Sequence, residues 1–313
     1  MSADIAEFTA RVADNVEQVI IGKRREIELI LVGLLCRGHI LLEDVPGTGK
    51  TMLARALAVS LGLDFKRLQC TPDLLPNDVT GVTVYDPRDA SFAFRRGPVF
   101  TNVLLADEIN RATPRTQAAL LEAMQERQVT ADGVTHRLQE PFLVLATQNP
   151  IEFEGTFPLP EAQLDRFLMR VSLGYPDSAE EARVLRNLNE QHPIDTLQGT
   201  ADPEELASLT DQVAKVHMEP ALEEYIVTLV RATRDHADLL LGASPRGSLA
   251  LHKTSQGLAA VRSRDHVLPD DIKEMAPLTL PHRLLLAPEA QLKGRTATTV
   301  IDEIVDQAEV RLG

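Results

Sequence analysis

The sequence is poor in cysteine, which restricts both its chemistry and its surroundings. Of 313 residues only Cys36 and Cys70 are cysteine, and neither belongs to a paired motif. Two cysteines cannot form a zinc cluster alone, and this pattern does not favour a disulfide framework. Both lie in apolar stretches, so we expect buried free thiols in a reducing compartment.

Long apolar runs and a basic N-terminus are also lacking. No apolar stretch approaches the roughly 18 residues that a membrane-spanning helix requires. The first residues, MSADIAEFTARVADNVEQVI, carry Asp and Glu where a secretory signal would carry Lys or Arg. We therefore expect a cytoplasmic protein with no membrane partner.

Basic charge is scarce as well. There are 32 Lys and Arg residues against 46 Asp and Glu, which gives a net charge of −14. Duplex DNA requires a basic face that neutralises phosphates. The only basic clusters, at 23–25 and 95–96, are short. A nucleic-acid partner is not expected, although a local contact through a pore or loop stays open.

Hydrophobic patterning divides the chain into two parts. Short apolar segments alternate with helical patterns as far as about residue 175, which predicts a parallel sheet covered on both faces. The expected strands lie at 39–42, 64–70, 102–108, 142–149 and 167–173. Beyond this point the chain is rich in Leu, Ala and Val, and Tyr225 is its only aromatic residue after Tyr175. We predict an α/β domain over 1–175 and a smaller all-helical domain over 176–313.

Two β-hairpins are predicted within the first domain. One covers about 82–96, where β-prone runs flank a turn. The other covers 128–138, where Asp132-Gly133 is a strong hairpin signal. Each hairpin could contact a partner, or could only cover a sheet edge.

The segment HILLEDVPGTGKTMLARAL, residues 39–57, resembles a phosphate-binding loop with one departure. The usual G-x-x-x-x-G-K-[ST] pattern requires glycine at position 44, where this chain has Asp44. Backbone N–H groups of 46–51 would hold phosphates at a helix N-terminus, Lys50 would add a charge, and Thr51 would offer its hydroxyl to Mg²⁺. Asp44 precedes these donors and would mainly need a permissive backbone angle. An ordinary strand–loop–helix connection is the alternative.

Paired acids end the strand predicted at 102–108. Ligands bind at the carboxyl edge of open parallel sheets. Asp107 would hold Mg²⁺, directly or through water, and Glu108 would polarise an attacking water. The alternative is a solvated strand end.

Four motifs together resemble the MoxR family of AAA+ ATPases: GTGKT, LLADEINRATPRTQAALLEAMQERQVT, LATQNP and EGTFPLPEAQLDRF. The family commonly has EDVPG before its glycine-rich turn, which accounts for Asp44 by analogy. The resemblance implies an AAA+ P-loop αβα core followed by a helical lid. It also implies ATP and Mg²⁺ as cofactors, with Thr51 and Asp107 holding the metal.

Residue roles follow from the same resemblance. Asn149 matches the sensor-1 residue, Arg166 the arginine finger that serves a neighbouring subunit, and Arg246 the sensor-2 residue that reaches back from the lid. With Glu108 and Lys50, Asn149 and Arg166 form the implied catalytic set. The implied nucleotide-binding set is Ile20, Ile21, Gly22, Pro46, Gly47, Thr48, Gly49, Lys50, Thr51, Met52 and Arg246.

Each of the three matched residues also has a plainer interpretation. Asn149 precedes Pro150 and could be a turn residue. Arg166 could form a local surface pair with Asp165, worth under about 1 kcal/mol. Arg246 could be a solvated arginine at a helix start. The eight histidines show no metal-ligand spacing and are expected to be structural or exposed.

The resemblance implies a homo-oligomeric ring, commonly a hexamer, that remodels a protein client in a chaperone-like manner. The family often works with a partner that carries a von Willebrand factor A domain. Three alternatives remain: the motor of a metal chelatase or helicase, a nucleotide-gated switch with little turnover, and, less favoured, a small-molecule kinase.

Overall fold

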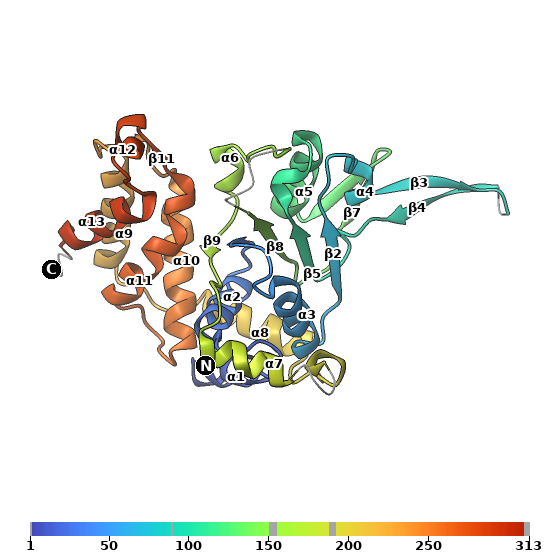
Figure 1. Cartoon of the computed structure of the whole chain (residues 1–313), viewed down its shortest axis with the longest axis horizontal. Helices are drawn as coiled ribbons and strands as arrows, with labels where there is room; N and C mark the ends of the chain where they lie inside the picture. Colours follow the sequence, from blue (N-terminus) through green and yellow to red (C-terminus); the bar gives the residue numbers. More distant parts are fainter. Residues whose placement is uncertain (1, 89, 150–154, 188–191, 310–313) are drawn as a thin grey trace.

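The computed structural model describes residues 2–88, 90–149, 155–187 and 192–309, and a parallel β-sheet lies at its centre (Figure 1). The sheet has five strands in the order β2-β5-β8-β1-β9, and every neighbouring pair is parallel. The strands are β1 (Ile40–Glu43), β2 (Phe65–Gln69), β5 (Val103–Asp107), β8 (Leu143–Gln148) and β9 (Met169–Val171). All five coincide with predicted strands.

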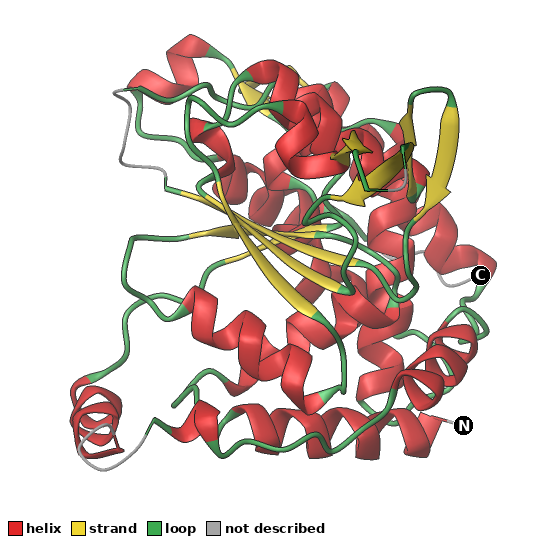
Figure 2. Ribbon diagram, turned by 90° about the vertical axis from the view of Figure 1, so that its right-hand side faces the viewer, coloured by secondary structure: helices red, strands yellow, loops and turns green. Residues whose placement is uncertain are grey.

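Helices cover both faces of this sheet, as Figure 2 shows. Side chains alternate along each strand, so Leu105 and Leu145 join one apolar cluster while Leu104 and Val144 join another. The first cluster includes α1 (Ser2–Val16), α2 (Arg24–Leu35) and α3 (Lys50–Ser60); the second includes α5 (Pro114–Glu126). The predicted three-layered αβα core is confirmed.

Both hairpins form where the sequence predicts them. β3 (Gly81–Asp86) pairs with β4 (Ser91–Arg96), and this hairpin extends well away from the body of the molecule (Figure 1). The shorter β6 (Gln128–Ala131) pairs with β7 (Val134–Arg137) through Asp132 and Gly133, which both have positive φ angles. The short helices α4 (Pro76–Thr80) and η1 (Ile109–Arg111) complete this side of the core.

The C-terminal part is helical and packs beside strand β9. Its main helices are α9 (Pro220–Arg234), α10 (Pro245–Val261), α11 (Pro269–Thr279) and α13 (Ala297–Gln307). Shorter elements are η3 (Pro281–Arg283), α12 (Pro288–Leu292) and an antiparallel pair of β10 (Leu239–Leu241) and β11 (Leu285–Leu286), which the sequence did not reveal.

The segment between the two parts contains α6 (Glu161–Leu164), α7 (Ser178–Asn187), η2 (Pro193–Asp195) and α8 (Pro203–Val213). Helix α8 packs against α1 and α2 of the core as well as against α10. The boundary near residue 175 stays a prediction.

The lid helix α10 approaches α2 very closely at Gly257. A Cβ atom at Gly257 would lie 2.7 Å from Cys36 Sγ and 2.9 Å from Val32 Cγ1. A larger residue would force the two helices apart. Gly257 is therefore a fixed contact point between lid and core.

Within the described residues, no helix has both the length and the apolar character needed to cross a bilayer. The same residues contain no group of three or more His, Cys, Asp or Glu side chains placed to hold a metal ion.

Candidate functional site

The turn between β1 and α3 has the backbone of a phosphate-binding loop. Gly47 and Gly49 have φ angles of 85° and 84°, which side-chain-bearing residues rarely adopt. A Cβ atom added at Gly47 would meet nothing within 4 Å, so any larger side chain would project into open space above the loop. Gly49 caps α3, whose N-terminal N–H groups face the same space. The loop thus suits a phosphate group.

Asp44 has a different role from the one that its position suggested. Its φ is not among the positive angles, so the expectation that it needs a permissive backbone is wrong. Instead the residue is 7% exposed, and its carboxylate accepts hydrogen bonds from the N–H groups of Val45 at 2.9 Å and of Leu173 and Gly174 at 2.8 Å. Asp44 fastens the loop to the chain that leaves β9.

Lys50 is the first residue of α3, and its side chain points back into the loop before it. Its Nζ donates to the carbonyl oxygen of Val45 at 2.7 Å and lies 3.3 Å from the hydroxyl of Thr48. Burial lowers the pKa of Lys50, while the charges of Asp44, Asp107 and Glu108 oppose that shift. The ammonium group is held at the mouth of the loop by acceptors that a phosphate oxygen could replace.

The two acids at the end of β5 share an unexpected partner, Thr147. The Thr147 hydroxyl donates to Asp107 Oδ1 at 2.6 Å and accepts from the Glu108 N–H at 2.7 Å. Because Thr147 lies near the end of β8, which neighbours β5, it fixes the carboxylate of Asp107 and the backbone of Glu108 relative to the sheet. The sequence contained a weak signal for it, since Thr147 lies two residues before Asn149.

The Glu108 backbone is strained, with a φ of 56°. A non-glycine residue in this left-handed region costs roughly 1–2 kcal/mol. Its side chain is also held, because Glu108 Oε2 accepts from Gln69 at 3.0 Å and from Arg111 at 3.1 Å. Such local strain is concentrated at functional sites in proteins.

Arg67 is a further residue that the sequence analysis missed. Its guanidinium donates to Asp107 Oδ2 from NH2 at 2.6 Å and from Nε at 3.1 Å. Arg67 belongs to β2, the strand next to β5, so this contact joins side chains of two adjacent strands. A cation bound by Asp107 would share that oxygen with Arg67.

These groups surround one cavity of about 420 Å³. It brings together the predicted Lys50, Thr51, Asp107, Glu108 and Asn149. The full lining is Asp44, Pro46, Gly47, Thr48, Gly49, Lys50, Thr51, Met52, Arg67, Asp107, Glu108, Thr147, Gln148 and Asn149. One carboxylate and one hydroxyl beside a phosphate loop match the way proteins hold Mg²⁺, with phosphate and water filling the other positions.

A second, more apolar cavity of about 250 Å³ shares Gly47, Thr48, Gly49 and Met52 with the first. Ile20 and Ile21 form part of its wall, as the resemblance implied for an adenine site. Gly22 is not in the wall; a Cβ there would overlap the Glu180 side chain, 1.7 Å from its Oε1. The sequence missed the other wall residues: Val19, Lys23, Pro176, Val184, His192 and Pro193.

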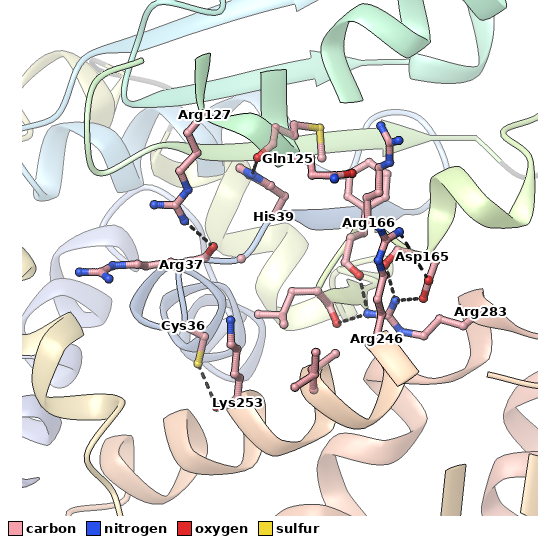
Figure 3. A pocket seen from close by; sticks show the side chains of 16 residues that line it. Cys36, Arg37, His39, Gln125, Arg127, Asp165, Arg166, Arg246, Lys253 and Arg283 are labelled. Atoms are coloured by element: carbon pink, nitrogen blue, oxygen red, sulfur yellow. Dashed lines mark hydrogen bonds and ion pairs between the residues drawn. The ribbon is translucent and has the colours of Figure 1, made fainter. Parts of the chain in front are cut away.

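Arg166 and Arg246 lie elsewhere, in a cavity of about 360 Å³ shown in Figure 3. Its walls include Arg37 and His39 before β1, and Leu168 before β9. Parallel strands start at one edge of a sheet and end at the other. This cavity therefore lies at the edge opposite to the phosphate loop. The expectation that Arg246 reaches back to its own subunit's phosphates is not met here.

The plainer interpretation of Arg166 is not met either. Asp165 is paired with Arg283, at 2.6 Å, and not with Arg166. The Nε of Arg166 is buried and has no hydrogen-bond partner among the described residues. Among the described residues that line this cavity there are six cationic side chains and a single acid, Asp165: the cations are Arg37, Arg127, Arg166, Arg246, Lys253 and Arg283.

Phosphate loop, paired acids and helical lid together define an AAA-type nucleotide-binding protein, and comparisons with known proteins agree. The family described as ATPase family associated with various cellular activities (AAA) matches residues 39–169, and the AAA lid domain matches 231–304. A crystal structure from Cytophaga hutchinsonii, provisionally assigned as an ATPase, superposes with a TM-score of 0.93 at 40% identity, covering 99% of this chain and 96% of that one.

Curated relatives specify the family further. The chain is 42% identical to Chaperone MoxR1 of Mycobacterium tuberculosis, over 93% of this chain and 79% of that protein. It is 34% identical to Protein MoxR of Paracoccus denitrificans over 92% of each, and 50% identical to the uncharacterized protein YeaC of Bacillus subtilis over 98% of this chain and 96% of YeaC. The chain belongs to the MoxR family of AAA+ ATPases.

Proposed function

We propose that this chain hydrolyses ATP with Mg²⁺ in a ring whose subunits complete one another's active sites. The observation that carries the proposal is the separation of the machinery over two edges of the sheet. Phosphate loop and paired acids occupy one edge, whereas Arg166 and Arg246 occupy the other. A subunit that contains both halves, but not together, requires a second copy.

The nucleotide binds at the edge of the sheet that carries the phosphate loop. The 46–51 loop holds the phosphates, and the apolar wall with Ile20 and Ile21 receives the base. Thr51 and Asp107 hold Mg²⁺, which neutralises charge on the phosphate oxygens. Adenine rather than guanine is proposed on the family resemblance.

Water activation falls to Glu108, which Thr147 and Gln69 hold in place. Its carboxylate accepts a proton from the attacking water as the bond from that water to the γ-phosphorus forms and the bond from the γ-phosphorus to the ADP oxygen breaks, so that ADP leaves. Asn149 lies in the same cavity at the end of β8 and orients that water through its amide. Lys50 stabilises the charge that develops on the outer phosphates.

Arg166 enters the neighbouring subunit's site as an arginine finger, and Arg246 accompanies it. Fingers supply about 10³–10⁵ in rate to related phosphoryl transfers. A hexameric ring is proposed from the family resemblance. The similarity to Chaperone MoxR1 supports remodelling of a protein client, and the family resemblance adds a partner with a von Willebrand factor A domain in the cytoplasm.

Steady-state phosphate release from ATP tests the proposal, with wild type beside Glu108→Gln over a range of protein concentration. Wild type should turn over, with specific activity that rises with concentration as subunits associate. Glu108→Gln should bind ATP and release phosphate at least about 100-fold more slowly. Equal release by the two proteins would identify a nucleotide-gated switch, or a motor that awaits its partner.

A further inference from the structure

The residue before the proposed finger is held by the lid. Asp165 Oδ1 accepts from Arg283 NH1 at 2.6 Å, and Asp165 Oδ2 accepts from the Ser244 hydroxyl at 2.8 Å. Arg246 NH1 lies 3.8 Å from the same Oδ2. All three partners belong to the helical part, and Asp165 immediately precedes Arg166.

Arg283 grips the backbone of the same segment. Its side chain is 2% exposed, and its guanidinium donates to the carbonyl oxygens of Asp165 at 2.6 Å and Phe167 at 2.7 Å. A weaker contact reaches the Leu168 carbonyl at 3.2 Å. The Nε donates within the lid, to Thr279 at 2.8 Å. The buried guanidinium of Arg283 thus joins η3 to Asp165 and Phe167, the two residues that flank Arg166.

His282 adds to this attachment, because its Nε2 lies 3.1 Å from the Phe167 carbonyl oxygen. The Nε of Arg166 takes no part in this attachment, since it is buried without a hydrogen-bond partner among the described residues. The hydrogen bonds to the lid therefore act on the residues on either side of the finger and not on the finger itself. The backbone of those residues is fixed to the lid.

We propose that Asp165 and Arg283 are positioning residues that aim Arg166 at the neighbouring subunit's phosphates. The inference rests on the proposed function and extends it. Because Ser244, Arg246 and Arg283 all belong to the lid, the lid of one subunit controls catalysis in the site next to it. A change of lid position on nucleotide binding would move the finger that the adjacent site needs.

Subunit mixing tests this inference. A Glu108→Gln subunit has a dead site but an intact finger, and an Arg166→Ala subunit has the reverse, so their mixture should regain ATP turnover. Asp165→Asn alone should lose between about 10- and 100-fold in kcat, as expected for a displaced catalytic group. Its ATP affinity, measured with a fluorescent nucleotide, should stay within about twofold because its own phosphate loop is untouched.

The decisive result is the mixture of Asp165→Asn with Glu108→Gln. Activity should return as it does for Arg166→Ala, because a neighbour supplies a well-placed finger. Asp302→Asn, an exposed acid-to-amide change in α13, is the matched control and should behave as wild type. If Asp165→Asn does not fold, Ser244→Ala removes one hydrogen bond to the same carboxylate and should show a smaller loss that mixing equally restores.

Each other outcome overturns the inference in its own way. Mixing with Glu108→Gln could restore ATP turnover to Arg166→Ala but not to Asp165→Asn or Ser244→Ala. That result would place the defect of the last two variants in their own ATP site. Full activity of Asp165→Asn and of Ser244→Ala without mixing would show that the finger needs no positioning. No recovery in the Arg166→Ala control would contradict the shared site itself, and the positioning role with it.

Discussion

The carboxylate of Asp44 lies 2.8 Å from the backbone nitrogen of Gly174, although 130 residues separate them in the chain. The contact joins the first residue of the phosphate loop to the segment that leads from β9 towards Pro176 in the proposed base pocket. The phosphate and base parts of the site are therefore fastened together through one side chain.

Asp44→Gly, which creates the usual loop pattern, is expected to destabilise the protein. It leaves the N–H groups of Leu173 and Gly174 without an acceptor, at roughly 1–3 kcal/mol for the buried donor of Leu173 and less for the half-buried donor of Gly174. Urea unfolding measures the loss, and ATP affinity should fall as well. The milder Asp44→Asn keeps one acceptor oxygen and should lie between. Unchanged stability of Asp44→Gly would show that the clamp contributes nothing.

Thr147→Val should lower kcat by about 10- to 100-fold, the usual cost of losing a group that orients metal ligands. Valine has nearly the same shape but cannot donate to Asp107 or accept from the Glu108 N–H. Thr147→Ser keeps the hydroxyl and should retain most of the activity. Phosphate release at saturating ATP and Mg²⁺ compares the three proteins, and equal rates for Val and Ser would contradict the role of the hydroxyl.

Acid should destabilise the fold through His39. Burial lowers the pKa of His39 to about 4, a shift to which Arg127 also contributes and which the carbonyl of Met124 opposes. Unfolded chains bind a proton below about pH 6.5, whereas the folded chain cannot until about pH 4. Stability is thus unaffected above pH 6.5 and falls with acidification between these values, by about 3 kcal/mol for this group.

Urea unfolding between pH 7 and 4.5 checks that prediction. His39→Gln should make the slope shallower by about 1.4 kcal/mol per pH unit, since one proton fewer is taken up on unfolding. Leu292→Gln, an exposed change that adds and removes no ionisable group, is the control and should keep the wild-type slope. His282, whose pKa burial also lowers, should leave a residual slope in His39→Gln. Parallel slopes for both variants would rule out His39 as the cause.

Both cysteines should resist alkylation in the native protein. Burial raises the pKa of Cys36 and of Cys70 to about 12, so very little reactive thiolate exists at pH 8. Iodoacetamide labelling followed by mass spectrometry should find almost no native modification and two modified thiols in urea. Rapid native labelling of Cys36, which lines the cavity of Arg166, would contradict the raised pKa of its thiol.

The sequence predicted the central sheet because all five strands are short apolar runs with clear helical patterns between them. It also predicted the contents of the phosphate cavity, since Lys50, Thr51, Asp107 and Glu108 belong to local motifs that end strands or begin helices. Thr147 and Arg67 escaped because their importance depends on which strands are neighbours, and strand order is not written in any local pattern.

Long-range contacts explain the remaining differences. The role of Asp44 depends on its hydrogen bonds with Leu173 and Gly174, which are distant in the sequence. Arg246 was expected at the phosphates of its own chain, yet α10 packs against α2, and Arg246 lies with Asp165 at the other edge. The lid pair β10 and β11 escaped because strands of three and two residues carry no usable periodicity.

Because α10 contacts α2 closely at Gly257, a rotation of α10 about this point would move the N-terminus of the helix. Ser244, which caps α10, lies 13 residues before Gly257, or about 20 Å along a helix axis at 1.5 Å per residue. A tilt of about 3° around Gly257 would therefore displace Ser244 by about 1 Å, enough to break a hydrogen bond. A small rotation of α10 at Gly257 would thus be enough to change the alignment of the finger.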